Sequence, residues 1–203
     1  PRSTLFPYTT LFRSVVIAAG PRIFGRLVAE IPQLRAAAAR AADARPVRAY
    51  CRDVALSEVP RPNDTFALGL DHATYASLHS ATAVLAPAGG GVLHLAHYLR
   101  PSESADSEVL AARLHAVAEA LQPGYARWVH HERTLPNIIV CNDFPRADCG
   151  GLAGRVPGSF AELRGLAVVG DWVGAEGLLI DAVAASARAA IEALAPSGLR
   201  QVA

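Results

Sequence analysis

The stretch LAVVGDWVGAEG, residues 166–177, decides the fold class of this 203-residue chain. Its first four residues are all apolar, which predicts a short strand buried on both faces. A turn with three glycines follows, and an alanine-rich segment from Leu178 to Leu194 has the periodicity of a helix. Strand, glycine-bearing turn and helix in this order are typical of the ligand-binding part of an α/β fold.

A second apolar run, VVIAA at Val15–Ala19, is closed by Gly20-Pro21 and also predicts an inner parallel strand. The segment from Arg22 to Ala42 has helical spacing that is broken at Pro32. Proline interrupts a helix, so we expect one kinked helix or two short ones. We therefore predict an α/β protein in which the runs 15–19 and 166–169 share one parallel sheet.

The middle of the chain has a different pattern, with short β-like runs separated by Pro, Asn, Asp and Gly. It predicts a separate antiparallel sheet, with strands at 47–54, 65–70, 81–85, 92–98 and 137–141. A helix is expected from the cap Asp106 to Leu121. Gly89-Gly90-Gly91 reads as a hairpin turn.

Composition narrows the choice of partners. The chain is 52% hydrophobic and 18% charged, and its net charge of +1 comes from 19 basic residues, all Arg, and 18 acidic ones. This balance argues against a nucleic-acid-binding protein, and we expect a small-molecule partner.

The uncharged stretch 72–99 is interrupted by His, Ser, Thr and a proline-glycine run. We therefore expect no transmembrane segment, while peripheral membrane contact stays open. Three irregularly spaced cysteines point to the cytoplasm.

The turn after the strand 166–169 carries the candidate chemistry. A helix N-terminus attracts an anion, and Gly177 lets a ligand approach the backbone. Asp171 follows a buried strand and can accept hydrogen bonds from sugar hydroxyls. The alternative is structural: Asp171 is a turn or helix cap, and Gly174 and Gly177 are ordinary loop glycines.

Residues 163–194 resemble the carboxyl-terminal flavin-binding motif of FAD-dependent oxidoreductases of the amine oxidase and phytoene desaturase type. The resemblance implies that Gly170 and Asp171 hold the ribityl or pyrophosphate region of FAD. It also implies that the backbone at Gly177, Leu178 and Leu179 faces the flavin ring. Two further cofactor contacts are expected, at Trp172 and at Ala19, which ends a run similar to the last inner strand of the FAD domain.

The same resemblance implies a domain plan and an activity. Residues 15–45 and 150–203 would be part of a Rossmann-like FAD-binding domain, and residues 46–149 a substrate-binding domain. FAD would accept a hydride from a C–N or C–C bond of a largely apolar small molecule, and no protein nucleophile is needed. An FAD-dependent isomerase without net redox, and a non-catalytic protein that binds an apolar ligand, are the alternatives.

The amino-terminal fingerprint G-x-G-x-x-G of that family is absent from this sequence, which favours a carboxyl-terminal fragment that binds FAD poorly by itself. Residues 4–14, TLFPYTTLFRS, resemble a translated sequencing adapter. We expect residues 1–14 to be an artefactual leader.

The remaining candidates are weaker. His130, His131 and Glu132 are adjacent on a predicted strand and point to alternate faces, which does not suit one metal ion. Cys141 and Cys149 lack the spacing of a zinc site. Four histidines lie in an apolar sheet region and are expected to be core or pocket-lining residues: His72, His79, His94 and His97.

Overall fold

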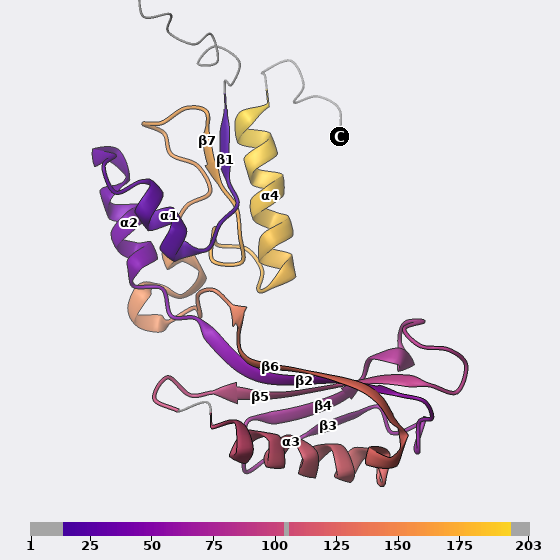
Figure 1. Cartoon of the computed structure of the whole chain (residues 1–203). Helices are drawn as coiled ribbons and strands as arrows, with labels where there is room; N and C mark the ends of the chain where they lie inside the picture. Colours follow the sequence, from indigo (N-terminus) through magenta and orange to yellow (C-terminus); the bar gives the residue numbers. More distant parts are fainter. Residues whose placement is uncertain (1–13, 104–105, 196–203) are drawn as a thin grey trace, which may run out of the picture. The chain divides into compact units, whose positions relative to one another are not determined.

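The computed structural model describes residues 14–103 and 106–195. The chain divides into two compact units (Figure 1). Unit 1 combines the segment up to Pro46 with the segment from Cys141 onward, and unit 2 is the continuous segment Val47–Val140. The expected leader lies almost wholly outside the described residues.

Unit 1 contains a two-stranded parallel sheet of β1 (Val15–Ile17) and β7 (Leu166–Val168). In the register of this sheet Val16 pairs with Ala167. The predicted pairing of the two apolar runs is therefore confirmed, and so is the α/β class. The two strands are about 150 residues apart in sequence, so the sheet forms by a long-range contact.

Helices cover this sheet on two sides. α1 (Pro21–Leu27) starts with proline at its first position, and a 3-10 turn (Pro32–Leu34) separates it from α2 (Arg35–Ala42). The expected break at Pro32 is confirmed. α1 and α2 lie on one side of the β1–β7 pair and α4 on the other (Figure 1). The core of the first side joins helix, strand and turn residues, among them Phe24, Val28, Leu34, Val168 and Trp172.

α4 (Ile180–Leu194) begins two residues later than expected. Its buried residues, Ala182, Ser186 and Ala190, are four apart and small, so one stripe of the helix can lie close to β7. Arg188 of α4 forms an ion pair with Glu176 of the preceding turn, at 2.9 Å.

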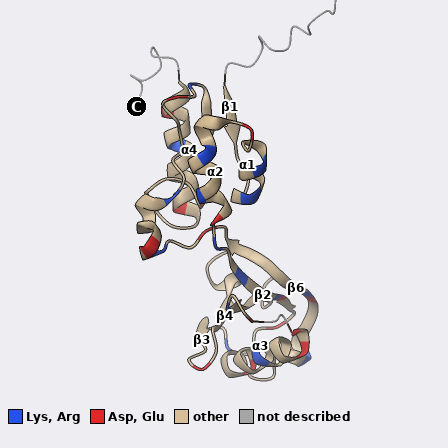
Figure 2. Cartoon of the chain, turned by 90° about the vertical axis from the view of Figure 1, so that its left-hand side faces the viewer, with Lys and Arg blue, Asp and Glu red and all other residues tan. Residues whose placement is uncertain are grey.

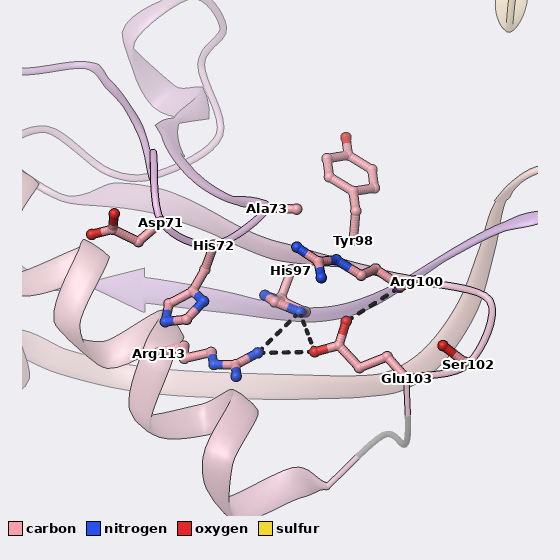
Figure 3. Close-up of a pocket in the computed structure, with 9 residues that line it drawn as sticks. All are labelled: Asp71, His72, Ala73, His97, Tyr98, Arg100, Ser102, Glu103 and Arg113. Atoms are coloured by element: carbon pink, nitrogen blue, oxygen red, sulfur yellow. Dashed lines mark hydrogen bonds and ion pairs between the residues drawn. The ribbon is translucent and has the colours of Figure 1, made fainter.

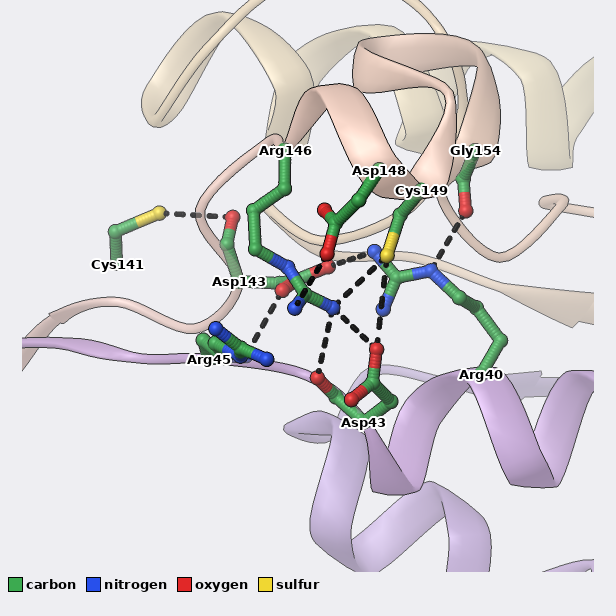
Figure 4. Close-up of polar contacts among 9 residues, drawn as sticks. All are labelled: Arg40, Asp43, Arg45, Cys141, Asp143, Arg146, Asp148, Cys149 and Gly154. Carbon is green, nitrogen blue, oxygen red and sulfur yellow. Dashed lines mark hydrogen bonds and ion pairs between the residues drawn. The ribbon is translucent and has the colours of Figure 1, made fainter.

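Residues 141–149 were assigned to the middle block, but they lie in unit 1. Charged groups at the end of α2 hold them there (Figure 4). Asp143, 2% exposed, accepts hydrogen bonds from the Arg40 side chain at 2.5 Å and from the Arg45 amide at 2.9 Å. Arg146 pairs with Asp43 and Asp148. The 3-10 turns Ala147–Cys149 and Gly151–Gly154 follow in the chain.

Unit 2 is a five-stranded sheet in the order β3-β4-β5-β2-β6. The pairs β2–β5, β4–β5 and β3–β4 are antiparallel, as expected. The strands are β2 (Val47–Leu56), β3 (Phe66–Leu68), β4 (Thr74–Leu78), β5 (Gly91–Leu99) and β6 (Val129–Cys141). β6 is longer than predicted and contains Pro136, which an edge strand tolerates.

α3 (Ser107–Leu121) covers one face of this sheet. The predicted cap is confirmed, because Asp106 Oδ1 accepts hydrogen bonds from the amides of Glu108 at 3.0 Å and Val109 at 3.3 Å. Leucines on the buried stripe of α3 pack against Leu93 and Leu95 of β5. A 3-10 turn, Tyr125–Trp128, leads into β6.

The predicted strand at 81–85 is wrong. A 3-10 turn spans His79–Ala81, and Val84 is 99% exposed, so this apolar run has no partner to bury it. The strand is instead β4, whose Thr74, Ala76 and Leu78 face the core. Two of these residues are too small or polar to give a strong apolar signal. The glycine run does precede β5, and Gly89 has a φ of +84° that favours glycine.

Charges of both signs are distributed over both units (Figure 2). Among the described helices, none combines the length and the hydropathy needed to cross a bilayer.

Candidate functional site

The candidate site lies in unit 1, where the chain leaves β7 for α4. Asp171 is 9% exposed, and both of its oxygens bind Asn142. Oδ2 accepts a hydrogen bond from the Asn142 amide at 2.8 Å, and Oδ1 accepts one from Asn142 Nδ2 at 2.9 Å. Asp171 therefore has a structural role. Each oxygen of a carboxylate has two lone pairs, so one acceptor position per oxygen remains for a ligand.

Gly170 connects the turn after β7 to α4 by hydrogen bonding. Its amide donates to Ser186 Oγ at 3.1 Å, and Ser186 Oγ donates in turn to the Val183 carbonyl at 3.0 Å. A Cβ on Gly170 would lie 2.7 Å from Trp172 Nε1. Glycine is therefore required here by the packing of the turn itself.

Trp172, predicted as a cofactor contact, is a core residue. Its side chain is 2% exposed, its Nε1 donates to the Ala19 carbonyl at 3.0 Å, and its ring lies 5.4 Å from that of Phe24. The indole is covered by protein atoms, and its N–H is bonded to the Ala19 carbonyl. The residue instead ties the end of β1 to the turn after β7.

Gly177 and Leu179 shape the start of α4. Gly177 has a φ of +71°, and a Cβ there would lie 2.8 Å from the Ala182 amide nitrogen. Leu179 precedes the helix with a φ of +52°, which is strained for a residue with a side chain. Among residues 14–103 and 106–195 no side chain caps the helix, and Leu178 and Leu179 are 53% and 49% exposed. The positive end of α4 is thus bordered by exposed apolar side chains.

Arg155, which the sequence analysis did not single out, is 5% exposed and supports this turn. Its Nη1 donates to the Gly177 carbonyl at 3.0 Å. Its Nε and Nη2 have no partner within the described residues. A buried guanidinium with unpaired donors is costly unless an acceptor or an anion binds to it. No local sequence pattern marks this contact, which spans 22 residues.

Cys141 ends the apolar run 137–141, and Asn142 follows it and donates two hydrogen bonds to Asp171. Burial raises the pKa of the Cys141 thiol, the Asp171 carboxylate raises it further, and the Arg155 guanidinium opposes them. Cys141 is therefore a buried thiol with little thiolate. The described residues contain no cluster of His, Cys, Asp and Glu suited to a metal ion.

The histidines of unit 2 fall into distinct environments. His94 Nδ1 lies 2.5 Å from Asp53 Oδ1, and the His79 ring stacks on the His94 ring. His97 is 2% exposed and lines a pocket together with the exposed His72 (Figure 3). His130 and His131 are exposed on β6.

The arrangement in unit 1 suits a ligand with a planar ring and a hydroxylated chain. Exposed leucines offer an apolar surface, Asp171 offers acceptor positions, and the uncapped helix start together with Arg155 offers N–H donors. Of the predicted residues, the structure brings Gly170, Asp171, Gly177 and the two leucines to one turn.

Comparison with known proteins shows the fold. No family model and no curated protein sequence matches the chain. An oxidoreductase from Methanosarcina mazei superposes with a TM-score of 0.62 at 17% identity, over 88% of this chain and 42% of that one. A protein from Pyrococcus furiosus superposes with a TM-score of 0.58 at 16% identity, over 90% and 41%. The chain thus spans about two fifths of each of these proteins.

Proposed function

We propose that unit 1 forms the part of an FAD-binding domain that holds the ribityl chain and the flavin ring, and that the chain belongs to a flavin-dependent oxidoreductase. The observation that carries the proposal is the turn 170–179. It carries Asp171, whose oxygens keep further acceptor positions, and leads into the start of α4, in a fold shared with an oxidoreductase. The resemblance of residues 163–194 to a flavin-binding motif supports the same assignment.

The side chains present fit this cofactor. Asp171 would accept hydrogen bonds from ribityl hydroxyls through its remaining lone pairs. The unpaired nitrogens of Arg155 would donate to cofactor oxygens, which removes the cost of burying them. The exposed Leu178 and Leu179 would lie against the apolar ring. When bound, FAD supplies the chemistry, which is acceptance of a hydride from a C–N or C–C bond.

The start of α4 would tune the cofactor. Reduction leaves negative charge near N1 and the C2 carbonyl of a flavin, and a helix N-terminus stabilises such a charge by about 0.3 to 2 kcal/mol. For a two-electron couple this corresponds to a rise of roughly 5 to 40 mV in potential. The contribution adjusts the reactivity and does not create it.

A largely apolar substrate is supported by the face of the unit 2 sheet that α3 leaves uncovered. Ala49, Cys51 and Ala96 form a small buried cluster there, and Tyr75, Leu135 and Ile138 pack against it. The Tyr75 and Tyr98 rings stack at 6.1 Å, and Tyr98 is 36% exposed. The aromatic rings are therefore what this face offers to a small molecule.

The three free cysteines support the reducing cytoplasm as the compartment of the protein.

Competition between flavins and nucleotides tests the proposal. The chain is titrated against FAD while flavin fluorescence is followed, with riboflavin and ADP as competitors. We expect weak, saturable binding that riboflavin competes for and ADP does not, because the adenosine half is held by the G-x-G-x-x-G unit in the family. The absence of flavin binding, or displacement of FAD by ADP alone, would contradict the proposal.

A substrate assay separates the reaction types. Anaerobic bleaching of the bound flavin by an apolar amine or alkene supports the oxidoreductase. Turnover without bleaching identifies the isomerase, and an apolar ligand that binds in the absence of any flavin identifies the non-catalytic binding protein.

A further inference from the structure

A polar pocket of about 500 Å³ lies within unit 2, where β5 ends and the chain turns toward α3 (Figure 3). Its volume falls in the range of small-ligand sites. The pocket walls include His72, His97, Arg100, Ser102, Glu103 and Arg113. His97 lies on the face of β5 that carries Leu93 and Leu95, which is the face covered by α3. The pocket is therefore on the opposite side of the sheet from the apolar cluster around Cys51.

Glu103 organises one wall of this pocket. Its Oε1 lies 3.1 Å from His97 Nε2 and 2.9 Å from Arg113 Nη1, and its Oε2 accepts a hydrogen bond from the Arg100 amide at 3.2 Å. The Arg100 amide, with Arg113 and His97, holds the pKa of the Glu103 carboxyl below its usual range. An ionised Glu103 only accepts hydrogen bonds, whereas Arg113 Nη1, which lies 3.4 Å from His97 Nε2, only donates, so we assign the hydrogen to Nε2 on the shorter of its two contacts, the one with Glu103.

His97 then presents its other nitrogen without a partner. The side chain is 2% exposed, and within the described residues nothing is hydrogen-bonded to Nδ1. In Figure 3 this nitrogen is turned away from Glu103, toward His72. In the tautomer that has its hydrogen on Nε2, Nδ1 is an acceptor. A buried acceptor without a donor is unfavourable, and a ligand with an O–H group would satisfy it.

The guanidinium groups of two arginines provide the pocket with N–H donors for an anion. The Arg113 side chain bonds Glu103 through Nη1 alone, and the Arg100 side chain has no hydrogen bond or ion pair within the described residues. Both of these arginines line the pocket, and both oxygens of Glu103 are occupied. Planar guanidinium groups bind carboxylate and phosphate oxygens through paired N–H donors.

We propose that this pocket binds a small oxyanion that also carries a hydroxyl group, either a phosphate or a short hydroxycarboxylate. The oxyanion lies against Arg100 and Arg113, and the hydroxyl donates to His97 Nδ1. A site built to accept a hydroxyl proton discriminates strongly against an analogue without one, because the buried acceptor then stays unpaired. The site does not depend on the proposed flavin site in unit 1.

Two matched ligand pairs test the proposal on the complete chain. Phosphate carries at least one hydroxyl at neutral pH and sulfate carries none, and glycolate differs from acetate by one hydroxyl. Binding is followed by NMR through the His97 ring and the Arg100 and Arg113 side chains. We expect at least a tenfold preference for the hydroxyl-bearing member of a pair. The pair that binds more tightly distinguishes a phosphate from a hydroxycarboxylate.

Two variants test separately whether Arg100 binds the oxyanion and whether His97 recognises the hydroxyl group. Arg100→Gln should weaken the binding of every ligand at least fivefold, whereas the exposed Arg22→Gln in α1 should change nothing. His97→Gln should abolish the preference within a pair. Since His97 is buried, the ligand pairs on the unmodified chain decide the matter if this variant does not fold. Equal binding within both pairs would mean an adventitious ion only, and absence of binding would overturn the proposal outright.

Discussion

The two units reach their folds by different routes. Unit 2 is continuous, and its antiparallel sheet and α3 come from one segment of 94 residues. Unit 1 joins two segments that are separated by all of unit 2, and its parallel sheet has only two strands of three residues each. Stability in unit 1 must therefore depend on a few large side chains that cross between the segments, whereas in unit 2 it is spread over a sheet and a long helix.

Trp172→Ala should produce the largest difference between the units. The buried indole packs on Phe24 and bonds the Ala19 carbonyl, so both segments of unit 1 depend on it. We expect a loss of about 3 to 5 kcal/mol in the unfolding free energy of unit 1. Amide hydrogen exchange resolves the two units, and protection should fall in unit 1 alone.

Trp128→Ala, in the 3-10 turn before β6, is the control, because this tryptophan is only half-buried and packs at the margin of the unit 2 core. It should cost less than Trp172→Ala and should affect only unit 2. Equal loss of protection in both units after Trp172→Ala would contradict the division of stability described above.

Gln122→Leu should have the next largest effect, within unit 2. Gln122 is fully buried, its Nε2 donates to the carbonyls of Arg61 at 2.8 Å and Asp64 at 2.6 Å, and its Oε1 accepts from the Arg61 amide at 2.8 Å. Removal of these partners leaves backbone groups unsatisfied, at a cost of about 2 to 3 kcal/mol.

Chemical denaturation measures this cost, and Gln122→Glu is the matched variant. Glu retains the acceptor for the Arg61 amide, and in its protonated form, which burial favours, it can still donate to one of the two carbonyls. Leu should therefore open the Arg61–Asp64 loop to exchange more than Glu does. If both variants were as stable as the parent chain, the loop would not be held by this side chain.

A smaller effect concerns acid stability. Burial of the Asp53 carboxyl raises its pKa, but hydrogen bonds from His94 and Arg133 outweigh this effect and hold the pKa below its usual value. A carboxyl with a lowered folded pKa contributes stability above its unfolded pKa of about 3.9, and the contribution is lost as the pH falls through the folded value. Since Asp53 is partly exposed, we expect no more than about 0.5 kcal/mol.

The measurement is the unfolding free energy of unit 2 between neutral pH and pH values below the usual range of Asp. Asp53→Asn should flatten the acid limb of this curve, and Asp71→Asn, an exposed acid of the same unit, should leave it unchanged. An unchanged acid limb in Asp53→Asn would show that the His94–Asp53 contact contributes nothing to folding.

Local signals account for what the sequence could predict. Continuous apolar runs identified β1 and β7, Pro32 marked the break between α1 and α2, and Asp106 marked the start of α3. β4 was missed because Ala76 and Thr74 give a weak apolar signal, while the exposed run 81–85 gave a strong one. Apolar residues indicate burial only where a partner strand exists.

Long-range polar contacts were beyond the reach of the sequence. The bonds of Asp171 to Asn142 and of Arg155 to Gly177 join loops whose approach is set by the tertiary fold. The same holds for Trp172, whose burial against Phe24 cannot be deduced from a glycine-rich turn. The motif located the turn, and the structure assigned each side chain its partners.

The most direct test of the flavin site compares Asp171→Ala with Asn142→Ala in the FAD titration. Both changes remove the bond between these two side chains, and Asp171→Ala also removes the acceptor of the Asn142 backbone amide, so it should lower stability more than Asn142→Ala does. Only Asp171→Ala removes the acceptor offered to the ribityl hydroxyls, at a cost of about 1.5 to 3 kcal/mol, or more than tenfold in affinity. We predict that Asp171→Ala weakens flavin binding at least tenfold and Asn142→Ala less than threefold. Equal affinities in the two variants would contradict the account, because Asp171 would then act only as the anchor of residue 142.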